Sequence, residues 1–227
     1  MSTLVKICGL NSPESLEAAL ACGADMVGFV FFPKSPRNVD LSSAQALSAQ
    51  IDGRAQKVAL LVDAEDKIIE GVIEALAPDW LQLHGKESPE RVQALRQKFG
   101  RPILKALGLA RAEDLAAVSP YEGIADALLF DAKPSPSALL PGGNGLSFDW
   151  AILQGYARRS KSQWLLSGGL DAGNVAEALR LTQAPGVDVS SGVEDSPGVK
   201  NPAKISAFIA AVRNAGARGS GRSCSKD

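Results

Sequence analysis

The chain has 227 residues, 45% of them hydrophobic, and 24 basic against 25 acidic side chains give a formal net charge of -1. This balance provides no basic excess for binding nucleic acid and no acidic excess typical of a disordered chain. No apolar run approaches the roughly 18 residues of a membrane-spanning helix, and the amino terminus lacks a secretory signal. We therefore expect a cytoplasmic protein that acts without a membrane, on a small molecule or a protein partner.

Eight short segments rich in β-branched and other apolar residues, each bounded by turn residues, predict eight strands. In chain order they cover residues 4–8, 25–31, 57–62, 80–84, 103–107, 127–131, 164–167 and 187–190.

Helical patterns lie between and after these strands. Two of them begin with Ser-Pro-Glu, at Ser12 and Ser88, which combines a capping side chain, a proline in the first turn and an early negative charge. The other predicted helices cover 42–51, 65–75, 112–118, 148–157, 172–181 and 202–214.

This strict alternation predicts a parallel sheet, and eight strand-helix units fit one closed (β/α)8 TIM barrel over residues 1–215. Two smaller domains are also compatible with the length. A doubly wound open sheet is a further alternative, but no GxGxxG follows the first strand. Residues 216–227 are small, polar and basic, which predicts a disordered tail.

In such a barrel, residues just past the carboxyl ends of the strands form the active-site rim. Cys8 and Asp131 end the first and sixth strands, and a thiol facing a carboxylic acid could perform acid-base catalysis. Each also has a structural interpretation, Cys8 as a small core residue and Asp131 as a cap. Alternation directs Gln82 and His84 into the barrel mouth, where a hydrogen-bonding role is favoured over proton transfer for His84.

Glycine-containing turns follow the seventh and eighth strands, the two places where such barrels commonly bind phosphate with backbone N–H groups. Glycines are common in ordinary tight turns, so one of these turns alone says little about phosphate binding. The two together predict a phosphorylated small-molecule ligand. The residues concerned are Gly168 and Gly169 in the first turn and Ser190, Ser191 and Gly192 in the second.

Two loops could complete the site. Arg37 lies in a proline-stiffened loop, 32–38, and its guanidinium could bind a carboxylate in bidentate fashion, with a solvated surface loop as an equal alternative. The segment 133–145 directly follows Asp131 and could act as a cover.

Three cysteines without CxxC spacing and one histidine predict neither a disulfide framework nor a metal site.

Seven motifs in register along residues 4–214 resemble phosphoribosylanthranilate isomerases. They are KICGL at 6–10, GFVFFPKSPRNV at 28–39, QLHG at 82–85, LLFDAK at 128–133, FDW at 148–150, LSGGL at 166–170 and DVSSGVE at 188–194. One departure is Asn144, where a hydroxyl residue is expected in relatives.

The resemblance implies a TIM barrel that catalyses an Amadori rearrangement in tryptophan biosynthesis without a cofactor. In this family pattern, Asp131 matches the general acid and Cys8 the general base. Arg37 matches the arginine that pairs with the anthranilate carboxylate, and the two glycine turns match the phosphate site.

The protonation states pose a difficulty. Unperturbed pKa values of about 8.5 for cysteine and about 3.9 for aspartic acid favour a thiol and a carboxylate, the reverse of what the mechanism needs. Reversing them would cost roughly 6 kcal/mol. We expect anionic substrate groups and burial to raise the pKa of the acid, and a cation to lower that of Cys8. Lys6, on the same side of the strand, is the candidate cation.

Two other functions stay open at this point. Another phosphate-binding barrel, such as indole-glycerol-phosphate synthase, would be expected to use a lysine acid and a glutamate base in place of Cys8 and Asp131. A non-catalytic sugar-phosphate binder could have kept the phosphate site. We expect a monomer, although the sequence leaves the oligomeric state open, as it does the use of the analogous histidine-pathway aminoaldose.

Overall fold

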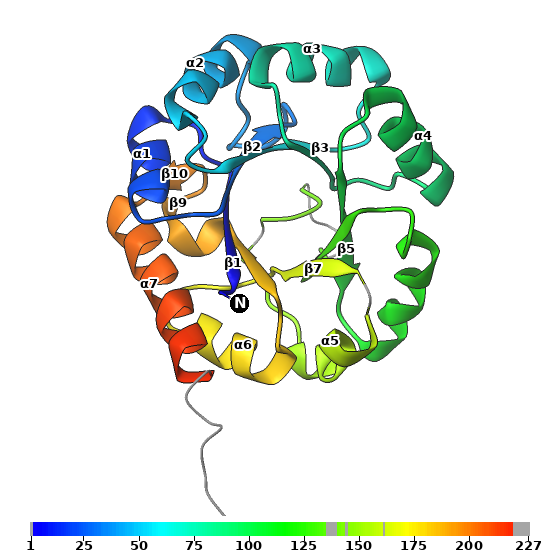
Figure 1. Ribbon diagram of the computed structural model, residues 1–227, viewed down its shortest axis with the longest axis vertical. Helices are drawn as coiled ribbons and strands as arrows, with labels where there is room; N and C mark the ends of the chain where they lie inside the picture. The colour runs from blue at the N-terminus through cyan, green and yellow to red at the C-terminus, as the bar shows by residue number, and fades with distance from the viewer. Residues whose placement is uncertain (1, 135–139, 144, 161, 220–227) are drawn as a thin grey trace, which may run out of the picture.

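The computed structural model describes residues 2–134, 140–143, 145–160 and 162–219. Eight parallel strands follow one another around a closed barrel, in which β1 pairs with both β2 and β8 (Figure 1). This closure confirms the TIM barrel and excludes the open sheet. The strands are β1 (Leu4–Cys8), β2 (Met26–Phe31), β3 (Gln56–Leu61), β4 (Trp80–Leu83), β5 (Ile103–Leu109), β6 (Ala127–Ala132), β7 (Gln163–Leu166) and β8 (Gly186–Val189).

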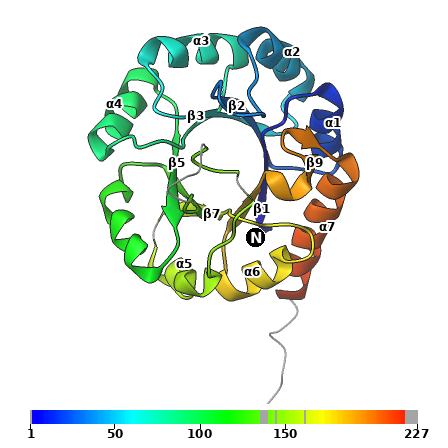
Figure 2. The ribbon, with the colours of Figure 1, turned by 180° about the vertical axis from the view of Figure 1, so that it is seen from behind.

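The helices form a ring outside the strands, seen from both ends of the barrel in Figures 1 and 2. The Ser-Pro-Glu starts act as predicted, because Ser12 and Ser88 accept hydrogen bonds from the backbone N–H groups of Ser15 and Arg91. The α-helices are α1 (Pro13–Ala21), α2 (Leu41–Ile51), α3 (Asp66–Leu76), α4 (Pro89–Phe99), α5 (Tyr156–Arg159), α6 (Val175–Thr182) and α7 (Pro202–Gly219).

The fifth predicted helix is instead two short 3-10 helices, η1 (Ala112–Ala117) and η2 (Ser119–Tyr121). The start is capped, because the Asp114 carboxylate accepts hydrogen bonds from the backbone N–H groups of Ala110 and Arg111. The proline after Ser119 disfavours a continuous α-helix through that residue.

The sixth predicted helix is also interrupted. A 3-10 helix, η3 (Trp150–Leu153), is separated from the one-turn α5 by Gly155. Gly155 has φ 78° and ψ -2°, a left-handed conformation that ends one turn before the next begins. The helical pattern predicted for residues 148–157 did not indicate this break.

The last helix extends beyond the predicted domain boundary. α7 continues to Gly219, so residues 216–219 are helical where the sequence predicted the start of a tail. The alanine at 217 is a good helix former, and it carries the helix past the glycine at 216. The remainder of the predicted tail, 220–227, lies outside the described residues.

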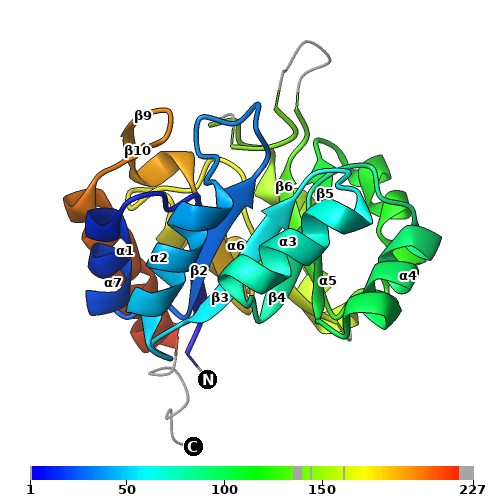
Figure 3. The same cartoon turned by 90° about the horizontal axis from the view of Figure 1, so that it is seen from above.

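Apolar side chains fill the space between the strands and the surrounding helices, and a separate group fills the barrel itself. The interior group is Met26, Val58, Leu104, Ala106, Ala127, Leu129 and Leu165. Above it Cys8 packs with Val30 and Leu60, close to the carboxyl ends of the strands. In Figure 3 these ends face upward, and the short hairpin of β9 (Glu194–Ser196) and β10 (Val199–Lys200) lies at the same edge.

Phe208 tests how far α7 contributes to the core, because its side chain is fully buried there. Phe208→Ala should lower the free energy of unfolding by about 3–5 kcal/mol through lost burial and the cavity left behind. Urea unfolding followed by tryptophan fluorescence measures this change. Ser206→Ala, on the exposed side of the same helix, should stay within about 0.5 kcal/mol of the parent. Equal stability of both variants would show that α7 is not part of the cooperative core.

Candidate active site

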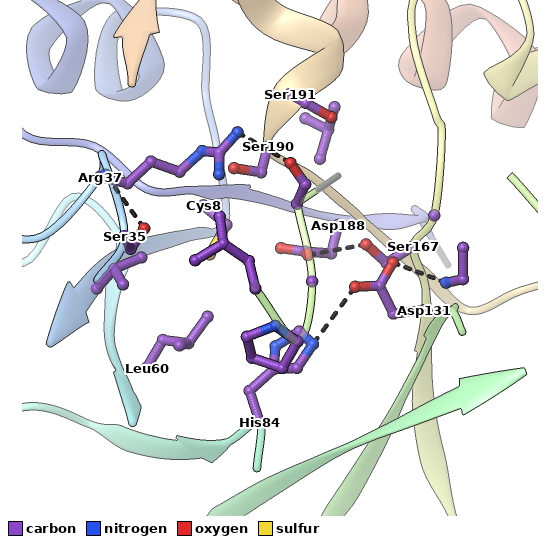
Figure 4. Close-up of a pocket in the computed structure, with 18 of the residues that line it drawn as sticks. Cys8, Ser35, Arg37, Leu60, His84, Asp131, Ser167, Asp188, Ser190 and Ser191 are labelled. Carbon is purple, nitrogen blue, oxygen red and sulfur yellow. Dashed lines mark hydrogen bonds and ion pairs between the residues drawn. The ribbon is translucent and has the colours of Figure 1, made fainter. Parts of the chain in front are cut away.

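A pocket opens at the carboxyl ends of the strands, and residues from opposite sides of the barrel line it (Figure 4). Nine of the ten residues predicted for the site line this pocket: Cys8, Arg37, Gln82, His84, Asp131, Gly168, Gly169, Ser190 and Ser191. The tenth, Gly192, lies in the 3-10 helix η4 (Ser191–Val193) directly behind the lining residues. The barrel thus brings the predicted catalytic pair and the predicted binding groups to one cavity.

Cys8 ends β1 and is 3% exposed. Burial raises the pKa of its thiol above the ordinary value because it disfavours the thiolate. The nearby Lys6 ammonium opposes this effect but does not reverse it. Lys6 therefore acts in the predicted direction, and burial outweighs it.

A second contribution comes from the carboxylate partner of Lys6, which raises the Cys8 pKa less than burial does. Lys6 Nζ lies 2.6 Å from Asp188 Oδ1, and both side chains are buried. Burial alone would lower the pKa of Lys6, but the ion pair with Asp188 and the Cys8 thiol raise it overall. Ser167 donates a hydrogen bond to the other oxygen of Asp188 at 3.1 Å. The charge beside Cys8 is therefore shared within a buried group that contains an anion as well as a cation.

Asp131 lies in β6 with both carboxylate oxygens engaged. Oδ1 accepts a hydrogen bond from the backbone N–H of Ala132 at 2.8 Å, so the predicted capping role is present. Oδ2 lies 3.3 Å from His84 Nε2, the contact drawn in Figure 4. On the other side of the ring, His84 Nδ1 lies 3.0 Å from Gln82 Nε2. The pocket-lining position of Gln82 and His84 confirms the alternation predicted for β4.

Glycines allow the backbone to pack closely where phosphate binding was predicted. Gly168 has φ +84°, and a Cβ there would lie 2.7 Å from the backbone nitrogen of Ala132. A Cβ at Gly192 would lie 1.9 Å from the carbonyl oxygen of Leu170. A larger residue at Gly192 would push the turn after β8 away from the turn after β7, and one at Gly168 would push the turn after β7 away from the end of β6.

Arg37 is 4% exposed, which makes the solvated-loop interpretation wrong. Its Nε and Nη2 donate to the two carboxylate oxygens of Glu194 at 2.7 and 2.8 Å. Nη2 also donates to the carbonyl oxygen of Gly143 at 3.1 Å. Glu194 occupies the Nε–Nη2 edge and the Gly143 carbonyl takes the other Nη2 hydrogen, so a ligand carboxylate would bind through Nη1.

Two functional side chains were missed in the sequence. Glu194 belongs to the DVSSGVE motif, yet its partner Arg37 is 157 residues away. Lys200 contacts Glu194 Oε1 at 2.8 Å and also binds the backbone oxygen and hydroxyl of Ser190, at 2.9 and 3.2 Å. This cluster joins the arginine to the turn after β8. No local pattern marks Lys200, because its role depends on the fold of the β9–β10 hairpin.

The part of segment 133–145 that the structure describes lies across the pocket. Gly142 packs directly over the His84–Asp131 contact, since a Cβ there would lie 2.6 Å from His84 Nε2 and 2.7 Å from Asp131 Oδ2. Asn144 lies outside the described residues.

Within the described chain, no cluster of three or more potential metal-ligating side chains is present, and no helix is both long and apolar enough to cross a membrane.

A family model described as N-(5'-phosphoribosyl)anthranilate (PRA) isomerase matches residues 5–211. The chain belongs to the PRA isomerase family. It is 59% identical over 213 residues to the N-(5'-phosphoribosyl)anthranilate isomerase of Rhodopseudomonas palustris strain HaA2, covering 94% of this chain and 97% of the relative.

Solved PRA isomerase structures share the fold. That of Thermotoga maritima superposes with a TM-score of 0.84 at 32% identity, covering 93% of this chain and 99% of the other. A second PRA isomerase structure, with a TM-score of 0.81 at 31% identity and the same coverage, was solved in complex with reduced 1-(o-carboxyphenylamino)-1-deoxyribulose 5-phosphate.

Glu194 offers a pH-dependent test of the cluster. Burial tends to raise the pKa of its carboxyl, but Arg37 and Lys200 outweigh burial and hold the pKa below its ordinary value. A lowered pKa in the folded state stabilises the protein above the unfolded value of about 4.3, and this contribution is lost as pH falls through the folded value. Glu194→Gln should therefore cost about 3 kcal/mol at pH 7, with the two stability curves converging at acid pH.

Urea unfolding from pH 3 to pH 7 measures this difference. Glu177→Gln is a matched control, because that side chain is 66% exposed and should change stability by no more than about 0.5 kcal/mol. A difference between Glu194→Gln and the parent that stays constant with pH would contradict the assigned charge role.

Proposed function

We propose that this chain converts N-(5'-phosphoribosyl)anthranilate to 1-(2-carboxyphenylamino)-1-deoxyribulose 5-phosphate, an Amadori rearrangement of tryptophan biosynthesis. One observation carries the proposal: a single pocket is lined by a thiol, a carboxylic acid, a buried arginine and two glycine turns. Membership of the PRA isomerase family supports the same reaction. Its localisation in the cytoplasm and a monomeric state stay predictions.

Two groups of the pocket match the two anionic groups of the substrate. The turns at Gly168 and Ser190 would hold the 5'-phosphate through backbone N–H groups. Arg37, fixed by Glu194 and the Gly143 carbonyl, would bind the anthranilate carboxylate through Nη1. The ribose then lies between Cys8 and Asp131, which is the part of the molecule where bonds must change.

In the proposed reaction, Asp131 donates a proton to the furanose ring oxygen as the bond from that oxygen to C1' breaks. The nitrogen lone pair forms the C1'–N double bond of an iminium ion. The Cys8 thiolate then removes the proton from C2', and the electron pair of that C–H bond returns toward nitrogen to give an enolamine. Tautomerisation of the enolamine yields the ketone. The substrate nitrogen accepts the electrons, so the scheme uses no cofactor.

The proposed base makes the reaction sensitive to pH. Because burial raises the pKa of Cys8, the thiolate is a minor form at neutral pH. kcat/KM should therefore rise with pH, and its acid limb should lie above the ordinary cysteine value of about 8.5. In Cys8→Ser this limb should vanish or move. A serine variant that is slower but keeps the limb at the same pH would assign the limb to another group.

Turnover is tested by following the fluorescence of freshly prepared phosphoribosylanthranilate. Cys8→Ala and Asp131→Ala should each lower kcat/KM by roughly 10³-fold, the scale expected for loss of a general base or acid. Ser206→Ala, far from the pocket, should match the parent. Binding of substrate without consumption above the nonenzymatic rate would favour a sugar-phosphate binder. A parallel assay with the histidine-pathway aminoaldose tests substrate range, and Arg37 favours the anthranilate compound.

A further inference from the structure

Gln82, His84 and Asp131 form a row across the floor of the pocket from β4 to β6. Gln82 Nε2 lies 3.0 Å from His84 Nδ1, and His84 Nε2 lies 3.3 Å from Asp131 Oδ2. Gln82 is completely buried, and its Oε1 has no hydrogen-bond partner among the described residues. A buried amide oxygen without a partner is costly, so this atom calls for an explanation.

The two ends of a glutamine amide have nearly the same shape but opposite hydrogen-bonding roles. With the nitrogen toward His84, the amide donates to Nδ1, which must then carry no proton. The single ring proton of the neutral imidazole lies on Nε2 and is donated to Asp131, which is then a carboxylate. We call this arrangement discharged.

Turning the amide by 180° places Oε1 toward His84, where it accepts a hydrogen bond from a protonated Nδ1. One further proton can then lie between His84 Nε2 and Asp131 Oδ2, held by either atom. We call this arrangement loaded. It differs from the discharged arrangement by one proton and by the position of the ring proton. It gives the amide oxygen a partner and moves the amide NH2 group to the side where the oxygen had none, so neither orientation satisfies both ends of the amide among the described residues.

We propose that Gln82 is a positioning residue that, by turning its amide, allows the His84–Asp131 pair to hold the proton that is donated to the substrate. The inference rests on the proposed role of Asp131 as general acid. Asp131 Oδ1 is bound to the backbone N–H of Ala132, which assigns the mobile proton to Oδ2.

Neighbouring residues confine the proposed proton exchange to Gln82, His84 and Asp131. Gly142 packs over the contact between His84 and Asp131 and limits the access of water, which strengthens the hydrogen bonds beneath it. The Lys105 ammonium binds the carbonyl oxygens of Leu83 and Gly85, on either side of His84, and so fixes the backbone that carries the ring. The titratable and charged groups around the row are Cys8, Arg37, Asp63, Glu87, Lys105 and Asp188.

His84 is the chain's single histidine, so its ring nitrogens give uniquely assigned signals in protein labelled with ¹⁵N-histidine. The protonation of Nδ1 distinguishes the two arrangements. In the wild type, loss of the Nδ1 proton with rising pH should coincide with the limb of the kcat/KM profile that remains in Cys8→Ser. The same midpoint in Cys8→Ser would show that the thiol is not the group being titrated.

Two variants at position 82 separate hydrogen bonding from packing. Gln82→Glu offers an ionised acceptor and no donor, so the loss of the Nδ1 proton should move up by about one pH unit or more, about tenfold in proton affinity, and the limb that remains in Cys8→Ser should follow it. Gln82→Met fills a similar volume with no hydrogen bond. Its kcat should fall about tenfold while KM stays within about threefold, whereas a residue that only fills space would leave kcat unchanged.

Asp131→Asn distinguishes failure of this inference from failure of the proposed function. With its oxygen on Ala132 N–H, the asparagine amide would donate to His84 Nε2 and keep Nδ1 protonated at every pH. An inactive Asp131→Asn whose Nδ1 is bare, or a Gln82→Glu midpoint equal to that of the wild type, would overturn the role of Gln82. An active Asp131→Asn would instead overturn Asp131 as the acid.

Discussion

The pairing of β1 with β8 closes the barrel, and the whole site depends on this closure. Residues 4–7 pair in register with 186–189, two segments separated by nearly the full length of the chain. At Gly186 a Cβ would lie 3.2 Å from that of Leu4, so glycine permits the close approach of the two strands. Once closed, the barrel places Cys8 beside the turn after β8 and across the mouth from β6. Parallel strands then direct all their carboxyl ends to one rim.

Buried charges determine the shape of that rim. An ion in the barrel interior is stable only with a partner, and removing one partner is strongly destabilising. The pairs Lys6–Asp188 and Lys105–Glu87 and the cluster of Arg37, Glu194 and Lys200 satisfy this requirement. Each cation also fixes a neighbouring group of the site: the environment of Cys8, the backbone around His84, or the guanidinium edge presented to the substrate. The ion pairs thus position the pocket as well as satisfying one another.

Local patterns predicted the parts of the molecule that depend on local physics. Strand alternation placed Gln82 and His84 inside the mouth, and the Ser-Pro-Glu starts marked two helices, because these features are set by a few adjacent residues. The break at Gly155 was missed because the spacing of apolar residues does not show which residue between them adopts a left-handed backbone conformation. Glu194 and Lys200 were missed because their partners come from distant segments. Asp188, the partner of Lys6, was missed for the same reason, since the two residues are 182 positions apart.

A thiol suits the position of Cys8 better than a carboxylate would. Asp188 already places a negative charge in this part of the barrel, and Lys6 is committed to it. A second carboxylate at position 8 would add an uncompensated anion, whereas a thiol is neutral in the resting site and costs little to bury. The raised pKa of Cys8 follows from this choice, because the same burial that accommodates the neutral thiol penalises the thiolate. If Cys8 is the base, its negative charge therefore forms only when a proton is to be taken, and the stability of the resting barrel does not depend on it.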